Sequence, residues 1–290
     1  MTGTNDKFRV ALVQLRSGRE VEPNLEAAEA LIRQAAAGRA ELVLTPENTA
    51  LMELNRKRLL QNTQAEEGNP AIGRLAALAK ELKLWLHIGS TGIKLSEKKI
   101  ANRSFLIDPE GAIVARYDKI HMFDVDLPGG ESYRESGHIQ PGGEAVIAEL
   151  PWGRLGFTIC YDLRFPALYR ALAQAGADFI AVPSAFTKQT GEAHWRVLLR
   201  ARAIETGCFM FAAAQGGAHE TGRDTYGHSM VVSPWGEVVA EAGIDPGVIF
   251  ADVEPAQIAA ARARIPSLEH DRAFEVASET SAQPNMKAAS

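Results

Sequence analysis

Two pairs of short segments in this chain repeat each other in the same order, and this repetition limits the folds that the chain can adopt. The run 40–47 (AELVLTPE) is echoed by 177–184 (ADFIAVPS), and each run follows a helical pattern that ends in glycine. The hairpin pattern 104–117 (SFLIDPEGAIVARY) is echoed by 229–242 (SMVVSPWGEVVAEA), with Pro and Gly at matching turn positions. The two echoes predict a domain with an internal duplication.

Short apolar runs alternate with amphipathic patterns along the chain. Strands are expected at 8–15, 41–45, 85–90 and 208–214, with a further hairpin at 145–160. Helices are expected at 24–37, 70–83, 165–175, 193–206 and 256–264. This alternation predicts an α/β fold in which helices cover a mixed sheet system. We expect a single domain over 8–275, with flexible ends at 1–7 and 276–290.

The composition argues against several classes of function. Lys and Arg number 31 against 36 Asp and Glu, so the formal net charge is −5 and the broad basic surface of a nucleic-acid binder is not expected. No apolar run approaches the roughly 18 residues that a membrane-spanning helix needs. The 2 cysteines exclude a disulfide framework and are typical of a reducing cytoplasm. We therefore expect a cytoplasmic protein that binds neither nucleic acid nor membranes.

Cys160 is the first candidate for chemistry. It ends the apolar run 155–159 and precedes a helical segment, so backbone N–H groups of that segment would point toward its thiol. Such groups lower a thiol pKa and can stabilise an oxyanion. The alternative is a buried structural cysteine, which is the commoner fate of this residue type. Cys208 begins a strongly apolar strand, and we expect it to be structural.

A thiol nucleophile needs a base, and no histidine of the chain stands in a known cysteine-protease signature. Glu47 ends a short buried strand, where partial burial would raise the pKa of its carboxyl toward the range of a general base. A solvated loop glutamate fits the same position equally well. Lys119 also follows a strand, where a lysine is usually a surface residue, and Glu135 has a weaker signal of its own.

Three segments taken together resemble the nitrilase, or carbon–nitrogen hydrolase, superfamily. They are LVLTPENT with Glu47, YDKIHMFD with Lys119, and GFTICYDLRFPALYRALAQAGADFIAVPSAF with Cys160. The order of the three residues and their wide spacing match the Glu-Lys-Cys triad of that family, and the resemblance covers about 9–274. The later runs HWRVLLRARAIETGCFMFAAAQ and YGHSMVVSPWGEVVA look like the Nit branch, which contains omega-amidases and deaminated glutathione amidases.

The resemblance implies a fold and an assembly. The fold is a four-layer α-β-β-α sandwich with internal pseudo-symmetry, which agrees with the two sequence echoes. The expected assembly is a homodimer or a higher homo-oligomer.

The resemblance also implies roles for individual residues. Cys160 would be the nucleophile, Glu47 the general base, and Lys119 the cation that holds the oxyanion together with the backbone N–H of Tyr161. Glu135 would be the second glutamate of the family, which helps to position the substrate. The remaining residues expected to contact substrate are Arg164, Tyr133, His121 and Trp195.

The implied reaction hydrolyses a small amide that carries a carboxylate, such as deaminated glutathione or a 2-oxo acid omega-amide. The products would be the acid and ammonia, formed through a thioester on Cys160. The expected partners are the amide substrate and water, and no metal or organic cofactor is expected.

Several alternatives stay open at this point. A nitrilase forms the same cysteine adduct, so the triad does not exclude it. A carbamoyl-amide hydrolase is a further option, because Arg164 stands where that branch binds a substrate carboxylate. Arg164 could equally support the following helix or pair with Asp162. A protein of another class, a non-catalytic scaffold of this fold, would have been free to lose the triad, which this chain retains.

Overall fold

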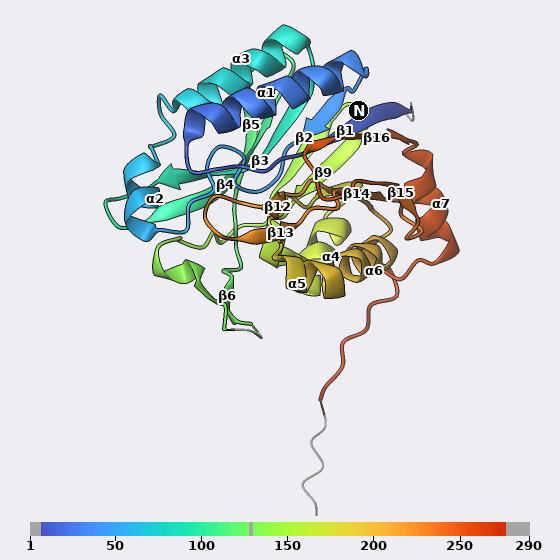
Figure 1. Cartoon of the computed structure of the whole chain (residues 1–290). Helices are drawn as coiled ribbons and strands as arrows, with labels where there is room; N and C mark the ends of the chain where they lie inside the picture. Colours follow the sequence, from blue (N-terminus) through green and yellow to red (C-terminus); the bar gives the residue numbers. More distant parts are fainter. Residues whose placement is uncertain (1–6, 128–129, 277–290) are drawn as a thin grey trace, which may run out of the picture.

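Two six-stranded sheets face each other at the centre of the molecule, and helices cover the outer face of each sheet (Figure 1). The computed structural model describes residues 7–127 and 130–276. The predicted α/β fold with four layers, α-β-β-α, is therefore confirmed. The predicted flexible ends, 1–7 and 276–290, fall outside the described residues except for Lys7 and Val276.

The first sheet is built mainly from the N-terminal half of the chain, with one strand from its C-terminal part. In spatial order it contains β16 (Gly247–Val253), β1 (Phe8–Gln14), β2 (Leu42–Leu44), β3 (Trp85–Lys94), β4 (Ile100–Ile107) and β5 (Ile113–Asp118). Strands β1, β2 and β3 are parallel, and the remaining neighbours in the sheet are antiparallel.

The second sheet repeats the plan of the first. It contains β8 (Ile147–Leu150), β9 (Gly153–Phe157), β10 (Phe179–Ala181), β11 (Phe209–Ala212), β14 (Met230–Val232) and β15 (Val238–Glu241). Read in this order, it has the same succession of antiparallel and parallel pairs as the first sheet read from β16 to β5. The first echo corresponds to β2 and β10, and the second to the hairpins β4–β5 and β14–β15. The pseudo-symmetry predicted from the echoes is thus present in the topology.

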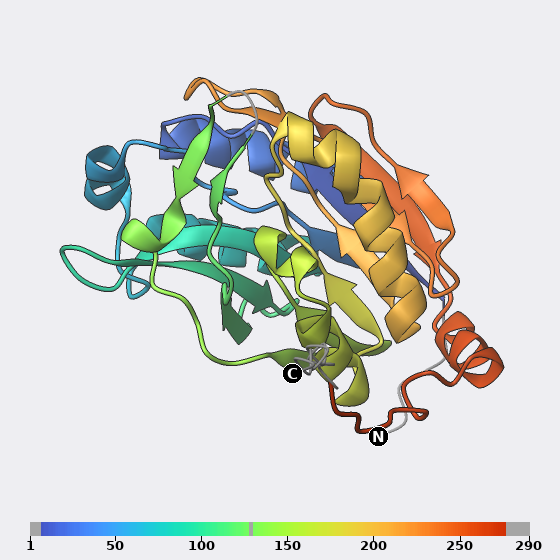
Figure 2. The same cartoon turned by 90° about the horizontal axis from the view of Figure 1, so that it is seen from below.

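Amphipathic helices close the two outer layers. The first sheet is covered by α1 (Val21–Ala37) and α3 (Pro70–Leu82), and the second by α4 (Pro166–Gln174) and α6 (Arg196–Thr206), which Figure 2 shows from below. In α1, the residues that face the sheet are Leu25, Ala28, Ile32 and Ala35, at the spacing of one helix face. The side chain of Asn69 caps the N-terminus of α3, and Pro70 occupies its first turn.

Apolar side chains from both sheets fill the space between them. Phe8 of β1 lies edge-on to Phe179 of β10, with 5.4 Å between the ring centroids. Leu12 of β1 and Phe157 of β9 are fully buried in the same cluster. A second cluster lies between the first sheet and helices α1 and α3. The two sheets therefore share one core, and their strand ends are held in fixed relative positions.

Some elements differ from the sequence-based expectation. The helix expected at 193–206 begins with a π-helical turn, Gly191–Trp195, and becomes regular only in α6. Helix α2 (Arg56–Asn62) and strand β16 were not anticipated, while α7 (Ala256–Arg264) has the expected bounds. Short elements complete the chain: α5 (Lys188–Thr190), β6 (Asp124–Asp126), β7 (Ser132–Arg134), β12 (Gly216–Ala218) and β13 (Asp224–Tyr226). None of the helices in the described residues is both long enough and apolar enough to cross a membrane.

Candidate active site

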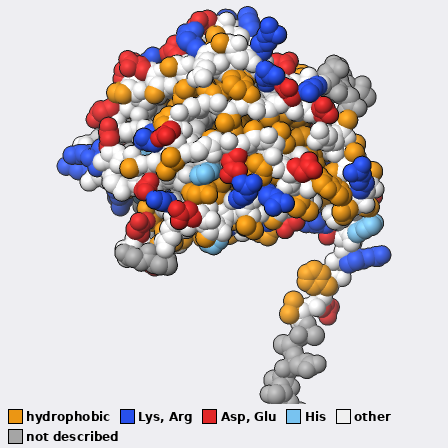
Figure 3. Space-filling view, turned by 45° about the vertical axis from the view of Figure 1, so that its right-hand side comes forward, with side chains coloured by type: hydrophobic (Ala, Val, Ile, Leu, Met, Phe, Trp, Pro, Cys, Tyr) orange, Lys and Arg blue, Asp and Glu red, His pale blue; other side chains and the backbone are white. Residues whose placement is uncertain are grey.

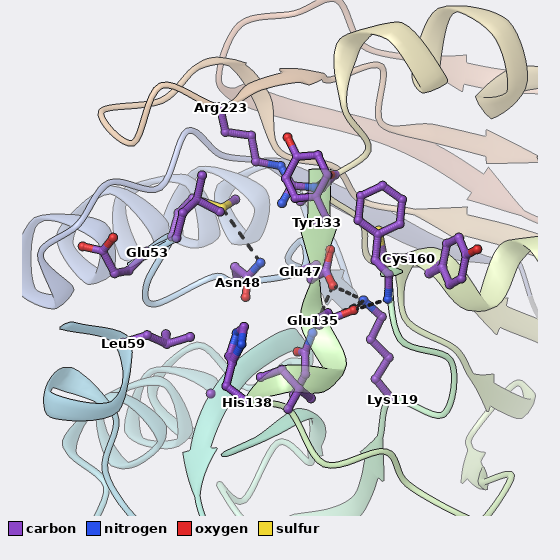
Figure 4. Close-up of a pocket in the computed structure, with 18 of the residues that line it drawn as sticks. Glu47, Asn48, Glu53, Leu59, Lys119, Tyr133, Glu135, His138, Cys160 and Arg223 are labelled. Atoms are coloured by element: carbon purple, nitrogen blue, oxygen red, sulfur yellow. Dashed lines mark hydrogen bonds and ion pairs between the residues drawn. The ribbon is translucent and has the colours of Figure 1, made fainter. Parts of the chain in front are cut away.

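A cavity of about 490 Å³ opens where strands of both sheets end, and the predicted triad lies on its wall (Figure 4). Glu47 follows β2 of the first sheet, and Cys160 follows β9 of the second. Lys119 comes directly after β5. Three segments that are distant in sequence therefore meet in one pocket, whose volume lies in the usual range for ligand sites.

The backbone at Cys160 is held in an unusual conformation. Its φ angle is 50°, in the left-handed region that residues other than glycine seldom adopt. The residue opens a short 3-10 helix, Cys160–Arg164, and its own N–H donates to the carbonyl of Pro183 at 2.9 Å. Asn48, next to Glu47, has a φ of 59°. Strained backbone of this kind is concentrated at functional sites, where the surrounding structure maintains it.

A buried ion cluster surrounds the thiol. Nζ of Lys119 donates to Oε1 of Glu47 at 3.0 Å and to Oε1 and Oε2 of Glu135 at 3.0 and 2.9 Å. The side chain of Lys119 is 2 % exposed and that of Glu47 is 4 % exposed. Glu135 also accepts a hydrogen bond from the N–H of Phe123 at 2.7 Å. The structure thus brings Glu47, Lys119, Glu135 and Cys160 together.

The ionisation of these groups follows from burial and from their mutual charges. Burial raises the pKa of Glu47, but the positive charges of Lys119 and Arg223 prevail and hold it below its ordinary value. Burial and the charge of Glu47 raise the pKa of the Cys160 thiol, opposite to the lowering expected from backbone N–H groups. Burial lowers the pKa of Lys119, but the carboxylates of Glu135 and Glu47 prevail and raise it. The resting site therefore holds a carboxylate, an ammonium and a neutral thiol.

The raised pKa expected for Glu47 is consequently wrong in direction. Full burial alone would favour the neutral carboxyl, as the sequence suggested. The sequence did not show that two cations would lie beside this carboxylate.

Asn102 of β4 is a positioning residue that the sequence analysis missed. Its side-chain amide donates to Oε1 of Glu47 at 3.0 Å, and its backbone carbonyl accepts from the N–H of Lys119 at 2.9 Å. One residue therefore fixes both the carboxylate and the lysine. An isolated asparagine within a strand carries no sequence signal for such a role.

Asp162 anchors the segment that carries the nucleophile. This carboxylate is fully buried and accepts hydrogen bonds from Tyr117 Oη at 2.6 Å and from the N–H of Ile159 at 2.8 Å. It also contacts His121, whose N–H donates at 3.0 Å and whose Nδ1 lies 2.7 Å away. The His121 ring stacks on Phe165 with 3.5 Å between the centroids.

Two expected substrate contacts are not brought to the pocket. His121 is occupied by Asp162 and Phe165 and does not line the cavity. Trp195 is 1 % exposed, packs on Phe186 and donates from Nε1 to the carbonyl of His228 at 2.8 Å. Both residues support the structure around the site, because their contacts are with protein groups behind its wall.

The other expected residues do line the cavity. They are Tyr161, Tyr133 and Arg164. The guanidinium of Arg164 lies over the rings of Phe186 and Tyr161, 5.3 and 5.9 Å from their centroids. It has no ion pair with Asp162 or with any other carboxylate in the described part of the chain. Arg223, which the sequence analysis did not single out, also lines this cavity.

The remaining reactive side chains suggest no second centre. Cys208 is fully buried, and its Sγ lies 3.2 Å from the carbonyl of Ala177, so it is structural as expected. Within residues 7–127 and 130–276, no group of three or more His, Cys, Asp and Glu side chains is arranged to hold a metal ion.

Comparison with known proteins places this chain in a family. The carbon–nitrogen hydrolase family model matches residues 9–263. A deaminated glutathione amidase from Yersinia enterocolitica is 42% identical over 266 residues, which cover 91% of this chain and 92% of that protein. The structure of the Caenorhabditis elegans NitFhit protein aligns with a TM-score of 0.86 at 36% identity, covering 94% of this chain and 69% of that chain.

A third similarity concerns an enzyme with a trapped adduct. An amidase from Nesterenkonia sp. AN1 aligns with a TM-score of 0.78 at 26% identity, covering 94% of this chain and 96% of that chain. Its structure carries the acetamide moiety of fluoroacetamide covalently added to its active-site cysteine. The chain described here belongs to the carbon–nitrogen hydrolase family and is an enzyme that hydrolyses amides.

Proposed function

We propose that the enzyme cleaves the amide bond of 2-oxo acid amides that carry carboxylates, with deaminated glutathione as the preferred substrate. The observation that carries this proposal is a neutral thiol beside an ionised carboxylate, in a cavity that also contains arginines without carboxylate partners among the described residues. Relatives named deaminated glutathione amidase, at 37 to 42% identity, support the choice of substrate.

The first half of the reaction forms a thioester. Glu47 takes the proton of the Cys160 thiol as the sulfur attacks the amide carbon. The Lys119 ammonium and the backbone N–H of Tyr161 stabilise the negative charge on the carbonyl oxygen. The C–N bond then breaks, and Glu47 returns the proton to the leaving nitrogen. A primary amide releases ammonia. Deaminated glutathione instead releases the amine of its remaining dipeptide, so the ammonia expected from the sequence is not a product of that substrate.

The second half regenerates the enzyme. Glu47 removes a proton from water, and the resulting oxygen nucleophile attacks the thioester carbon. The same groups stabilise the oxyanion, the C–S bond breaks, and the sulfur regains a proton. Glu135 keeps the Lys119 ammonium oriented through two hydrogen bonds during both halves.

The test measures 2-oxoglutarate formed from deaminated glutathione and from alpha-ketoglutaramate, and compares it with the ammonia released from a simple aryl nitrile. We expect both amides to be hydrolysed, and a quenched reaction to contain the acyl group on Cys160 by mass spectrometry. Faster turnover of the nitrile, or an adduct on another residue, would contradict the proposal. A metal chelator should leave the rate unchanged, because Lys119 supplies the positive charge at the oxyanion.

We also propose that the protein forms a homodimer through the helical layer that covers the second sheet. Val197 and Ile204 on α6 and Trp235 in the β14–β15 turn expose large apolar side chains. Figure 3, in which the right-hand edge of the molecule comes forward, shows apolar side chains across the middle of this edge and near the point where the C-terminal segment leaves. Light scattering should give the dimer mass, and Ile204→Glu should lower it; a monomeric wild-type protein would refute the assembly.

A reducing compartment such as the cytoplasm suits this chemistry, and we propose that location. Both cysteines are free thiols, and the reaction requires Cys160 in its reduced form. Fractionation of cells that express the protein tests the location, and recovery outside the cytoplasm would contradict it.

A further inference from the structure

Arg223 lines the cavity, and the reaction described above assigns no role to its positive charge. It precedes β13 and extends toward Glu47, with the Tyr133 ring beside it (Figure 4). Its guanidinium carbon lies 5.2 Å from the centroid of that ring. A planar cation held against an aromatic ring is well placed to bind a ligand carboxylate with its remaining donors.

The hydrogen-bonding state of Arg223 indicates that a partner is missing. One terminal nitrogen donates to the carbonyl of Ala185. Its Nε is buried and has no hydrogen-bond partner in the described part of the chain. No carboxylate among the described residues forms an ion pair with it. A ligand in the cavity cannot reach this sealed Nε, but the second terminal nitrogen has no hydrogen bond to any described residue, is not sealed off, and is left to donate to an anion.

The position of Arg223 indicates which part of a substrate it would meet. Its charge acts on the carboxylate of Glu47. Glu47 must pass a proton to the leaving nitrogen, so the leaving group departs on the Glu47 side of the scissile carbon. Arg164 lies elsewhere on the wall, over Phe186 and Tyr161 and beside His194. The cavity thus has Arg223 near the base, Glu47, and Arg164 at the end of the 3-10 helix that begins with Cys160.

We propose that Arg223 binds a carboxylate on the leaving group and so selects peptide-like amides over primary amides. The inference rests on the proposed function and extends it to the amine side of the bond. In deaminated glutathione, this carboxylate is the one at the glycine end of the released dipeptide. Alpha-ketoglutaramate has the same acyl group but releases ammonia, so its leaving group has no carboxylate for Arg223 to bind.

Because the two substrates share their acyl group, comparing them isolates the contribution of the leaving group. We would measure kcat/KM of the wild type and of Arg223→Met on both substrates, and compare the ratio of the two values. Loss of a charge-assisted pair should lower the ratio for deaminated glutathione over alpha-ketoglutaramate by about 10- to 150-fold. Any effect of Arg223 on the ionisation of Glu47 acts on both substrates and cancels in this ratio.

Arg56→Met is the matched control. Arg56 lies on the same cavity at the start of α2, but its side chain is exposed to solvent. Its removal takes the same charge from the same pocket and should change the ratio by less than about threefold. A ratio that falls equally in both variants would show a general charge effect and would overturn the assignment.

A third substrate tests the idea without any substitution. Deaminated glutathione with its glycine carboxylate converted to a carboxamide should be a poorer substrate for the wild type by a similar factor. Equal kcat/KM for the acid and the carboxamide would overturn the proposal, even if Arg223→Met failed to fold. So would equal losses on both substrates in that variant, which would show that Arg223 acts on the shared acyl group or on Glu47. A wild-type enzyme that hydrolysed neither substrate would instead refute the proposed function.

Discussion

The proton held between Cys160 and Glu47 sets the pH range in which the enzyme can react. The reactive form needs Glu47 ionised, and its pKa is below the ordinary 4.5. It also needs the thiol protonated, and its pKa is above the ordinary 9.0. Activity should therefore fall as the pH drops through the first value or rises through the second.

We accordingly expect kcat/KM to be level from about pH 5 to about pH 8.5. The measurement is a pH–rate profile on deaminated glutathione, with circular dichroism to exclude unfolding at the acid end. Glu47→Gln should lower the rate by orders of magnitude at every pH in the range. An acid limb with an apparent pKa near 6.5 would point to a histidine base and contradict this assignment.

The two cysteines differ in a way that chemistry can detect. Cys160 lines the cavity, whereas Cys208 is fully buried beside the carbonyl of Ala177. We expect Cys160→Ala to abolish turnover with the fold intact, and Cys208→Ala to retain most activity. Iodoacetamide should label Cys160 much faster, as followed by peptide mass spectrometry. Equal labelling of both thiols with retained activity would remove Cys160 as the nucleophile.

Arg164 offers a separate test at the acyl end of the substrate. Arg164→Lys keeps the charge but loses the planar fork that binds a carboxylate through two hydrogen bonds. If Arg164 holds the 2-oxo acid carboxylate, kcat/KM should fall about 10- to 150-fold more for 2-oxo acid amides than for a short uncharged amide. A common loss on charged and uncharged substrates would mean that Arg164 supports the Cys160 segment instead.

At the scale of strands and helices, the base depends on a close approach between β3 and the end of β2. Gly89 lies where a Cβ atom would collide with the carbonyl oxygens of Thr45 and Pro46, directly before Glu47. Gly89→Ala should therefore displace Glu47. We expect a stability loss of about 1–3 kcal/mol from overpacking and a fall in kcat of at least about tenfold.

Gly73 of α3 provides the matched substitution. It lies at an exposed position of this helix, and a Cβ atom there would meet open space. Gly73→Ala should raise stability by about 0.5–1 kcal/mol and leave kcat unchanged. Chemical denaturation and steady-state kinetics measure both effects. An active and stable Gly89→Ala enzyme would show that this contact does not position the base.

Local patterns account for the elements that could be predicted from the sequence. The start of α3 followed from Asn69 and Pro70, because capping chemistry is local. The repeated runs 40–47 and 177–184 located β2 and β10, because a short apolar run before a proline is also a local pattern. Strand β16 was missed, because pairing with β1 joins segments at opposite ends of the chain. Arg223 and Asn102 were missed because their roles arise only from tertiary contacts.

Strand β16 covers the edge of β1 and so completes the first sheet. This strand pairs with β1 at every position from Phe8 to Gln14, and Arg9 forms an ion pair with Asp252 across the two strands. We propose 8–275 as the folding unit, so a chain limited to these residues should keep the Tm and the kcat/KM of the full protein. A chain limited to 8–245 leaves the edge of β1 open and should aggregate. Sedimentation and thermal melts test both shortened chains, and a stable, soluble 8–245 chain would show that β16 is not needed to protect the edge of β1.

The same pairing has a consequence for how the protein is made. β1 leaves the ribosome before the strand that covers its edge, which lies at residues 247–253. At ordinary rates of translation, roughly 10 to 50 seconds pass between the two events. Throughout that interval, the nascent chain offers an apolar strand with unpaired N–H and C=O groups to any neighbour. Crowded polysomes translating this message would therefore bring together chains that all expose the same open edge until β16 arrives.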